Sequence, residues 1–199
     1  MTVVFDSTTL LLLLRPGVRA PIDPATGRPV EHAEERIAQL VSDLEKARVK
    51  IVVPTPALSE LLVHAGNAGP RLVEELTRSA AFKLAPFDTL AAVEVAEMTR
   101  IAIAAGDKRA GAAGTWAKVK FDRQLVAIAK VARADTFYTD DEDLRKFAEA
   151  QGLRVIRLAD LALPPTRAQT ELNLTDQSLV EQSVPSLDEI MNDDQSDDV

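Results

Sequence analysis

Short apolar runs alternate with helical patterns along the first 160 residues of the chain. Between the runs, apolar residues recur at the spacing of an amphipathic helix, as in Ile37, Leu40 and Leu44. Such alternation is typical of a parallel sheet covered by helices on both faces. We therefore predict a three-layer α/β/α fold with a mostly parallel sheet of about five strands. The runs rich in β-branched or aromatic residues, which predict the strands, lie at residues 2–5, 50–53, 82–87, 136–138 and 154–158.

Residues 118–144 contain the most informative pattern. Asp122 precedes a helical run of apolar residues, which places it at the cap or in the first turn of a helix. One short strand later, residues 139–143 read TDDED. Helix N-termini and strand C-termini lie on the same edge of an open parallel sheet. The sequence therefore predicts that these two groups of acids can meet at one place.

Other acids are predicted at the same edge. Asp6 directly follows the first strand, and Glu60 lies about one turn into the helix after the second. Several neighbouring carboxylates cannot all stay ionised unless a cation neutralises them, and Mg²⁺ and Mn²⁺ prefer oxygen ligands. Such ions support hydrolysis of phosphodiesters. The candidate acids are Asp6, Glu60, Asp122 and the group Asp140, Asp141 and Asp143.

Four segments in this order resemble the PIN-domain nucleases over roughly residues 1–160. They read VVFDSTTL at the N-terminus, PTPALSEL after the second strand, FDRQLVA at the predicted helix start and TDDEDL after the fourth strand. Many small bacterial members are VapC-like toxins, ribonucleases that an antitoxin protein holds inactive. The resemblance implies a PIN-like fold, Mg²⁺ or Mn²⁺ as cofactor, RNA as substrate, and an antitoxin and a second copy of the chain as candidate partners.

The resemblance also assigns roles to individual residues. The family's first three acids fall on Asp6, Glu60 and Asp122. The fourth falls on Asp141, with Asp143 as an auxiliary ligand and Asp140 at a variable position, although the residues alone leave these three open. The hydroxyl residues that hold such carboxylates, or a metal-bound water, correspond to Ser7, Thr8 and Thr139.

Composition excludes some kinds of catalytic and metal site and separates the chain into a neutral body and an acidic tail. The 199 residues include no cysteine and two histidines, which excludes thiolate chemistry and histidine-rich metal sites. Nine of the 31 acidic but only one of the 23 basic residues fall in residues 166–199, which leaves 22 of each in residues 1–165. We predict a nuclease domain at 1–165 with a Pro-rich insertion at 15–30, and an acidic, disordered tail at 166–199.

The longest apolar run is too short to span a membrane, so we expect a cytoplasmic protein with no membrane partner.

Basic residues surround the predicted helix start at Asp122. Lys118, Lys120 and Arg123 are candidate contacts to an RNA backbone, since phosphate contacts supply most sequence-independent affinity. The alternative is an ordinary solvated loop. Trp116, the only tryptophan, would either stack on a base or anchor this loop to the body.

Two functions from different classes remain open at this stage. The first is a metal-dependent endoribonuclease, with the toxin of a toxin–antitoxin pair as one form. The second is a catalytically weak or inactive PIN-like module that binds RNA or protein and is regulated by its acidic tail. A phosphoacceptor receiver domain is disfavoured, because that class carries a lysine after the last buried strand, whereas residues 159–161 here read ADL.

Overall fold

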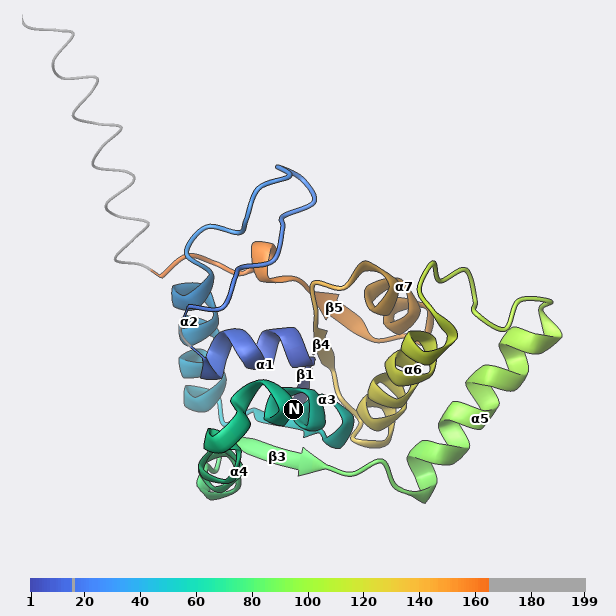
Figure 1. Ribbon diagram of the computed structural model, residues 1–199, viewed down its shortest axis with the longest axis horizontal. Helices are drawn as coiled ribbons and strands as arrows, with labels where there is room; N and C mark the ends of the chain where they lie inside the picture. The colour runs from blue at the N-terminus through green and yellow to red at the C-terminus, as the bar shows by residue number, and fades with distance from the viewer. Residues whose placement is uncertain (16, 165–199) are drawn as a thin grey trace, which may run out of the picture. The chain divides into compact units, whose positions relative to one another are not determined.

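A parallel sheet forms the centre of the fold in the computed structural model, which describes residues 1–15 and 17–164 (Figure 1). Every strand pairing in the sheet is parallel. Five strands contribute: β1 (Thr2–Phe5), β2 (Lys50–Pro54), β3 (Phe82–Ala85), β4 (Thr136–Tyr138) and β5 (Arg154–Ile156). Their order across the sheet is β3-β2-β1-β4-β5.

Helices join the strands and cover both faces of the sheet, which confirms the predicted α/β class (Figure 1). Met1–Ala162 form one compact unit. The α-helices are α1 (Ser7–Leu14), α2 (Ala33–Lys46), α3 (Thr55–Ala65), α4 (Gly69–Arg78), α5 (Thr89–Ala104), α6 (Trp116–Val131) and α7 (Glu142–Ala150), and single 3₁₀ turns lie at Gly66–Ala68 and Leu158–Asp160.

The strand order contains a topological switch point beside β1. The chain moves from β1 to β2 and β3 on one side, and β4 and β5 lie on the other side. β1 and β4 pair in register, with Val3 opposite Thr136 and Phe5 opposite Tyr138. Both strands therefore end side by side. In open α/β sheets, ligands bind outside the carboxyl ends of the strands at such a point.

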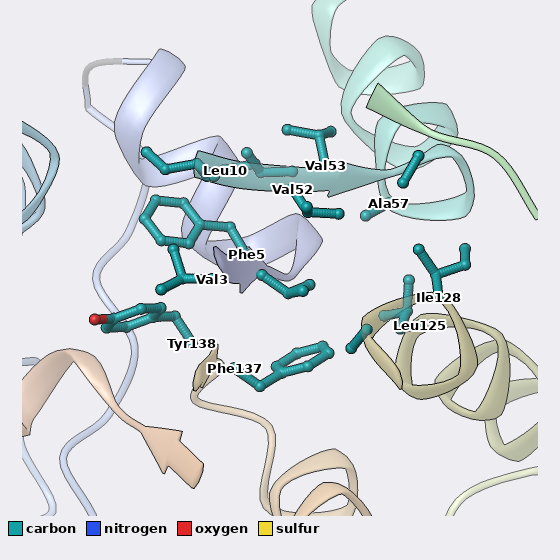
Figure 2. Packing of buried hydrophobic residues seen from close by; sticks show 14 of the residues in the cluster. Val3, Phe5, Leu10, Val52, Val53, Ala57, Leu125, Ile128, Phe137 and Tyr138 are labelled. Atoms are coloured by element: carbon teal, nitrogen blue, oxygen red, sulfur yellow. The ribbon is translucent and has the colours of Figure 1, made fainter. Parts of the chain in front are cut away.

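The core holds this edge of the sheet in place from both sides. Figure 2 shows Leu10 of α1 near Phe5 on one face, and Leu125 and Ile128 of α6 near Phe137 on the other. All five side chains are almost completely buried. Burying a side chain of this size contributes roughly 1.5–3 kcal/mol relative to exposure, so α1 and α6 are fixed firmly against the strands.

Helix α6 begins earlier than the sequence predicted. The predicted position of Asp122 at a cap or in a first turn is wrong, because Thr115 caps α6 by accepting a hydrogen bond from the Lys118 backbone N–H at 3.3 Å. Asp6 caps α1, and Asp141 caps α7. Side-chain acceptors at N-caps satisfy backbone donors that have no partner within the helix, which explains these starts.

The Pro-rich insertion contains no helix in the residues that the structure describes, as its prolines and glycines predicted. An isolated antiparallel bridge joins Ile22 to Pro29 within it. The acidic tail at 166–199 lies outside the described residues. No helix of residues 1–15 and 17–164 is both long and apolar enough to cross a membrane.

Candidate functional site

Four of the predicted acids line one cleft at the switch point. Its volume is about 450 Å³, and its walls come from α1, α3, α6 and the start of α7. Asp6, Glu60, Asp122 and Asp141 are separated by up to 135 positions in the sequence, but all four contribute to this lining. Ser7 and Thr8 line it as well, together with the apolar side chains of Phe121, Leu125 and Leu144.

Asp6 is fixed more firmly than any other acid of the cleft. Its side chain is 3% exposed and follows β1 directly. One carboxylate oxygen accepts the Thr9 backbone N–H at 2.7 Å, and the other accepts the Thr139 hydroxyl at 2.6 Å. Burial raises the pKa of Asp6 above its ordinary value although these hydrogen bonds oppose the shift, and the charge of Asp141 adds to the rise. A nearby cation would favour the ionised form.

Asp122 lies two turns into α6 and is also buried, at 5% exposure. Both of its carboxylate oxygens accept hydrogen bonds from the Lys118 ammonium, at 2.9 and 2.8 Å. Burial nevertheless raises the pKa of Asp122, because it outweighs the ion pair, and the charges of Asp141 and Asp143 add to the shift. This carboxylate is therefore close to one cation and to two further acids.

Asp141 reaches the cleft from the loop between β4 and α7. One of its oxygens caps α7 by accepting the Leu144 backbone N–H at 2.9 Å. The other lies 3.0 Å from the Lys118 ammonium, so the same lysine bridges Asp122 and Asp141. The Thr139 hydroxyl, which donates to Asp6, also accepts the Asp141 backbone N–H at 3.1 Å. Thr139 thus couples the first and the last acid of the site.

Glu60 completes the lining from α3, where its side chain is exposed. Thr55 and Pro56 begin this helix immediately after β2, which brings Glu60 to the sheet edge that the sequence predicted. An exposed glutamate can change rotamer at little cost. Glu60 is therefore the least constrained of the four candidate ligands, whereas the side chains of Asp6 and Asp122 are held by their surroundings.

The remaining members of the acidic group lie outside this lining. Asp143 accepts the Gly114 backbone N–H at 3.2 Å and lines a neighbouring cavity of about 250 Å³. Asp140 accepts the Leu158 backbone N–H at 3.0 Å. Its burial, together with the charge of Asp6, raises the pKa of Asp140 to about 6, although the hydrogen bond to Leu158 opposes the shift. The geometry therefore favours Asp141 over Asp140 and Asp143 as the fourth acid of the cleft.

The predicted RNA contact at Arg123 is wrong. Its side chain is completely buried and its guanidinium lies over the rings of Trp116 and Phe147, at 5.3 and 5.6 Å from their centroids. It donates to the Lys108 backbone oxygen at 2.6 Å and to the Thr99 hydroxyl at 2.8 Å. Arg123 therefore fixes the loop before α6 to the body, because the guanidinium donates in two directions while stacking on aromatic rings.

Lys118 and Lys120, the other predicted RNA contacts, differ from each other. The Lys118 ammonium is paired with carboxylates of the cleft and belongs to α6, which contradicts the alternative of an ordinary solvated loop at this residue. Lys120 is exposed, and its contact with RNA stays a prediction. The position of Lys118 could have been anticipated in part, because Lys118 and Asp122 are four residues apart and such pairs face each other on a helix.

Sequence reasoning also missed Thr9. This residue is buried, donates its N–H to Asp6 and directs its hydroxyl to the Tyr138 backbone oxygen at 3.3 Å. It therefore joins the carboxyl ends of β1 and β4. The available signal was its position three residues after Asp6, which is where the partner of an N-cap acid belongs.

The donor set fits a hard divalent cation by its chemistry. Carboxylate oxygens are the ligands that Mg²⁺ and Mn²⁺ prefer, and the Lys118 ammonium shows that the space between Asp122 and Asp141 accepts a positive charge. In residues 1–15 and 17–164, however, no three Asp, Glu or His side chains stand close enough together to hold a metal ion. Binding would therefore require side-chain movement, above all by Lys118 and Glu60.

Comparison with known proteins identifies the fold. No protein-family model and no curated protein matches the sequence. Among solved structures, the chain is similar to one in the crystal structure of VapBC2 from Rickettsia felis bound to a DNA fragment from their promoter, with a TM-score of 0.52 and 12% identity. A chain of DNA-bound VapBC from Salmonella typhimurium gives a TM-score of 0.50 and 14% identity. Each likeness covers 79% of this chain and 98% of the other, and together they confirm the predicted PIN-like fold.

Proposed function

We propose that the chain is a metal-dependent endoribonuclease that cleaves RNA phosphodiester bonds with Mg²⁺ or Mn²⁺. The observation that carries this proposal is the convergence of Asp6, Glu60, Asp122 and Asp141 on one cleft at the switch point of the sheet. Asp6 and Asp141 also cap helices, but capping does not require four carboxylates to line one cleft, where the charge of Asp141 disfavours ionisation of Asp6 and Asp122. A cation shared by the four acids would offset this repulsion.

The role of each residue follows from how firmly its side chain is held. Asp6, Asp122 and Asp141 would hold the cation with the more mobile Glu60, and Thr139 and Thr9 would keep the Asp6 carboxylate oriented through their hydrogen bonds. A bound divalent ion would supply a Lewis acid that activates water and offsets charge on the phosphate. The Ser7 and Thr8 hydroxyls line the same cleft and could donate to phosphate oxygens or water.

The likeness to VapBC structures favours a toxin that a partner antitoxin holds inactive. Expression of the wild-type chain alone should then arrest bacterial growth, whereas Asp6→Asn should not. Normal growth with the wild type at equal protein levels would argue against the toxin role but not against RNA cleavage.

A catalytically weak or inactive binding module is the second candidate function. The observation that favours it is the pairing of Lys118 with Asp122 and Asp141, which already neutralises part of the acidic cleft. Such a module would bind RNA or protein without cleaving it, and regulation by the acidic tail would belong to residues outside the described part of the chain.

One experiment separates the two candidates. Purified full-length protein is incubated with a mixed RNA pool in Mg²⁺, in Mn²⁺ and in EDTA, beside the Asp6→Asn variant. A nuclease should produce cleavage that requires the metal and disappears in the variant. Intact RNA under every condition would support the binding module, and cleavage that persists in EDTA would indicate a contaminating enzyme. Full metal-dependent cleavage by Asp6→Asn would argue against the proposed site.

A further inference from the structure

The Lys118 ammonium occupies the centre of the contact between α6 and the start of α7. It lies 2.9 and 2.8 Å from the two oxygens of Asp122 and 3.0 Å from Oδ2 of Asp141. Asp122 stands four residues further along the same helix, whereas Asp141 belongs to the N-cap of another. A single side chain of this protein therefore neutralises two of the four acids of the cleft.

The surrounding chain keeps Lys118 in this position. Its backbone N–H is bound by the Thr115 cap, and a Cβ added to Gly114 would come within 3.3 Å of the Lys118 Cδ. Gly114 itself is held by its hydrogen bond to Asp143. The ammonium is thus held between two carboxylates that belong to different helices.

An ammonium and a divalent cation cannot share these carboxylate oxygens, because like charges at that separation repel strongly. We propose that Lys118 is the internal counter-ion of the metal-free cleft, which competes with the divalent cation for Asp122 and Asp141 and so sets the metal concentration at which the cleft is occupied. The inference rests on the proposed metal-dependent function. It makes Lys118 a positioning residue that acts on the metal through the two acids.

The test is a measurement of Mn²⁺ affinity on the full-length protein, from the electron paramagnetic resonance signal of free Mn²⁺. Lys118→Met should bind Mn²⁺ about tenfold more tightly than the wild type, because the competing charge is gone. Lys120→Met removes the same charge from an exposed position of the same helix and should stay within about twofold of the wild type. Lys118→Arg keeps the charge and should not show the tenfold gain.

A second readout concerns the metal-free protein. In EDTA, Lys118→Met should melt at a lower temperature than the wild type, because Asp122 and Asp141 then repel each other. Saturating Mn²⁺ should raise its melting temperature by more than it raises that of the wild type, as expected for a ligand that binds only the native state. Circular dichroism confirms the fold, and Lys118→Gln replaces Lys118→Met if the latter does not fold.

The possible failures can be told apart. Equal or weaker Mn²⁺ binding by Lys118→Met, with clear binding by the wild type, would overturn the role of Lys118 and leave the proposed metal site intact. An equal gain in Lys120→Met would overturn it too, since the effect would then come from overall charge. If neither the wild type nor Lys118→Met binds Mn²⁺, both the role of Lys118 and the proposed function fail.

Discussion

The hydroxyl of Thr139 donates a hydrogen bond to the buried carboxylate of Asp6 at 2.6 Å. Thr139 follows β4 and Asp6 follows β1, so this bond joins the ends of two adjacent parallel strands. A hydrogen bond to a charged acceptor is roughly twice as strong as one between neutral groups. The bond therefore fixes an acid that burial would otherwise favour in its neutral form.

Thr139→Val should lower both stability and activity. The variant keeps the shape of the side chain but leaves one oxygen of Asp6 without its donor, at a cost of about 1–3 kcal/mol. Urea denaturation measures the loss. Thr136→Val is the matched control, because Thr136 is equally buried in β4 but pairs with Val3, away from the site. Equal losses of unfolding free energy in the two variants would show that the hydrogen bond to Asp6 contributes no more to stability than the Thr136 hydroxyl does.

Asp6→Asn and Asp122→Asn should each reduce metal-dependent RNA cleavage by about 100-fold or more, since each removes a carboxylate charge from the cleft. Asp6→Asn should melt at the same or a higher temperature in EDTA. Asparagine is a good N-cap, and it avoids the cost of burying a charge that the raised pKa of Asp6 indicates. Full cleavage activity in both variants would exclude the proposed site.

Asp141→Asn and Asp143→Asn distinguish between the candidates for the fourth acid. Asp141 lines the cleft with the other three acids, whereas Asp143 binds the Gly114 backbone and lines the adjacent cavity. RNA cleavage should therefore fall by about 100-fold or more in Asp141→Asn and by less than about tenfold in Asp143→Asn. The reverse order would place the metal nearer to Asp143.

Arg123→Met should destabilise the protein by about 1–3 kcal/mol, because it removes two hydrogen bonds and the stacking on Trp116 and Phe147. Trp116 is the only tryptophan, so its fluorescence reports directly on this contact and should shift to the red. Arg133→Met, which changes an exposed arginine, should leave both stability and fluorescence unchanged. An unchanged midpoint in urea for Arg123→Met would show that the loop does not depend on the guanidinium.

Tyr138 should titrate above the pKa of a free tyrosine. Burial raises the pKa of its hydroxyl, although the charge of Arg154 opposes the shift. Its ring packs edge-on against Phe5 at 5.1 Å between centroids. The unfolded chain has a tyrosine pKa of about 10, so the native state retains its proton longer and stability must fall as the pH rises past about 10. Tyr138 is the only tyrosine, and the ultraviolet absorbance of tyrosinate follows it alone.

The sequence by itself determined the order of the elements and the edge at which the acids lie. Short apolar runs that alternate with period-3.6 patterns predicted the parallel sheet, because strands covered by helices on both faces are apolar throughout, whereas a helix buries one face. Acids that follow strands, such as Asp6 and Asp141, were correctly placed at one sheet edge, since the geometry of parallel sheets requires it. The predicted start of α6 was wrong because it overlooked the Thr115 cap, which follows a glycine-containing segment.

Only the tertiary structure decided which side chains meet across the cleft. Lys118 and Arg123 are both basic residues of one helix, but the structure directs the first to two carboxylates and buries the second between aromatic rings. Asp141 and Asp143 are two positions apart and enter different cavities. The orientation of a side chain depends on residues that are distant in sequence, because packing and charge pairing act through space. The pattern of residues along the chain does not show which of these distant residues come into contact.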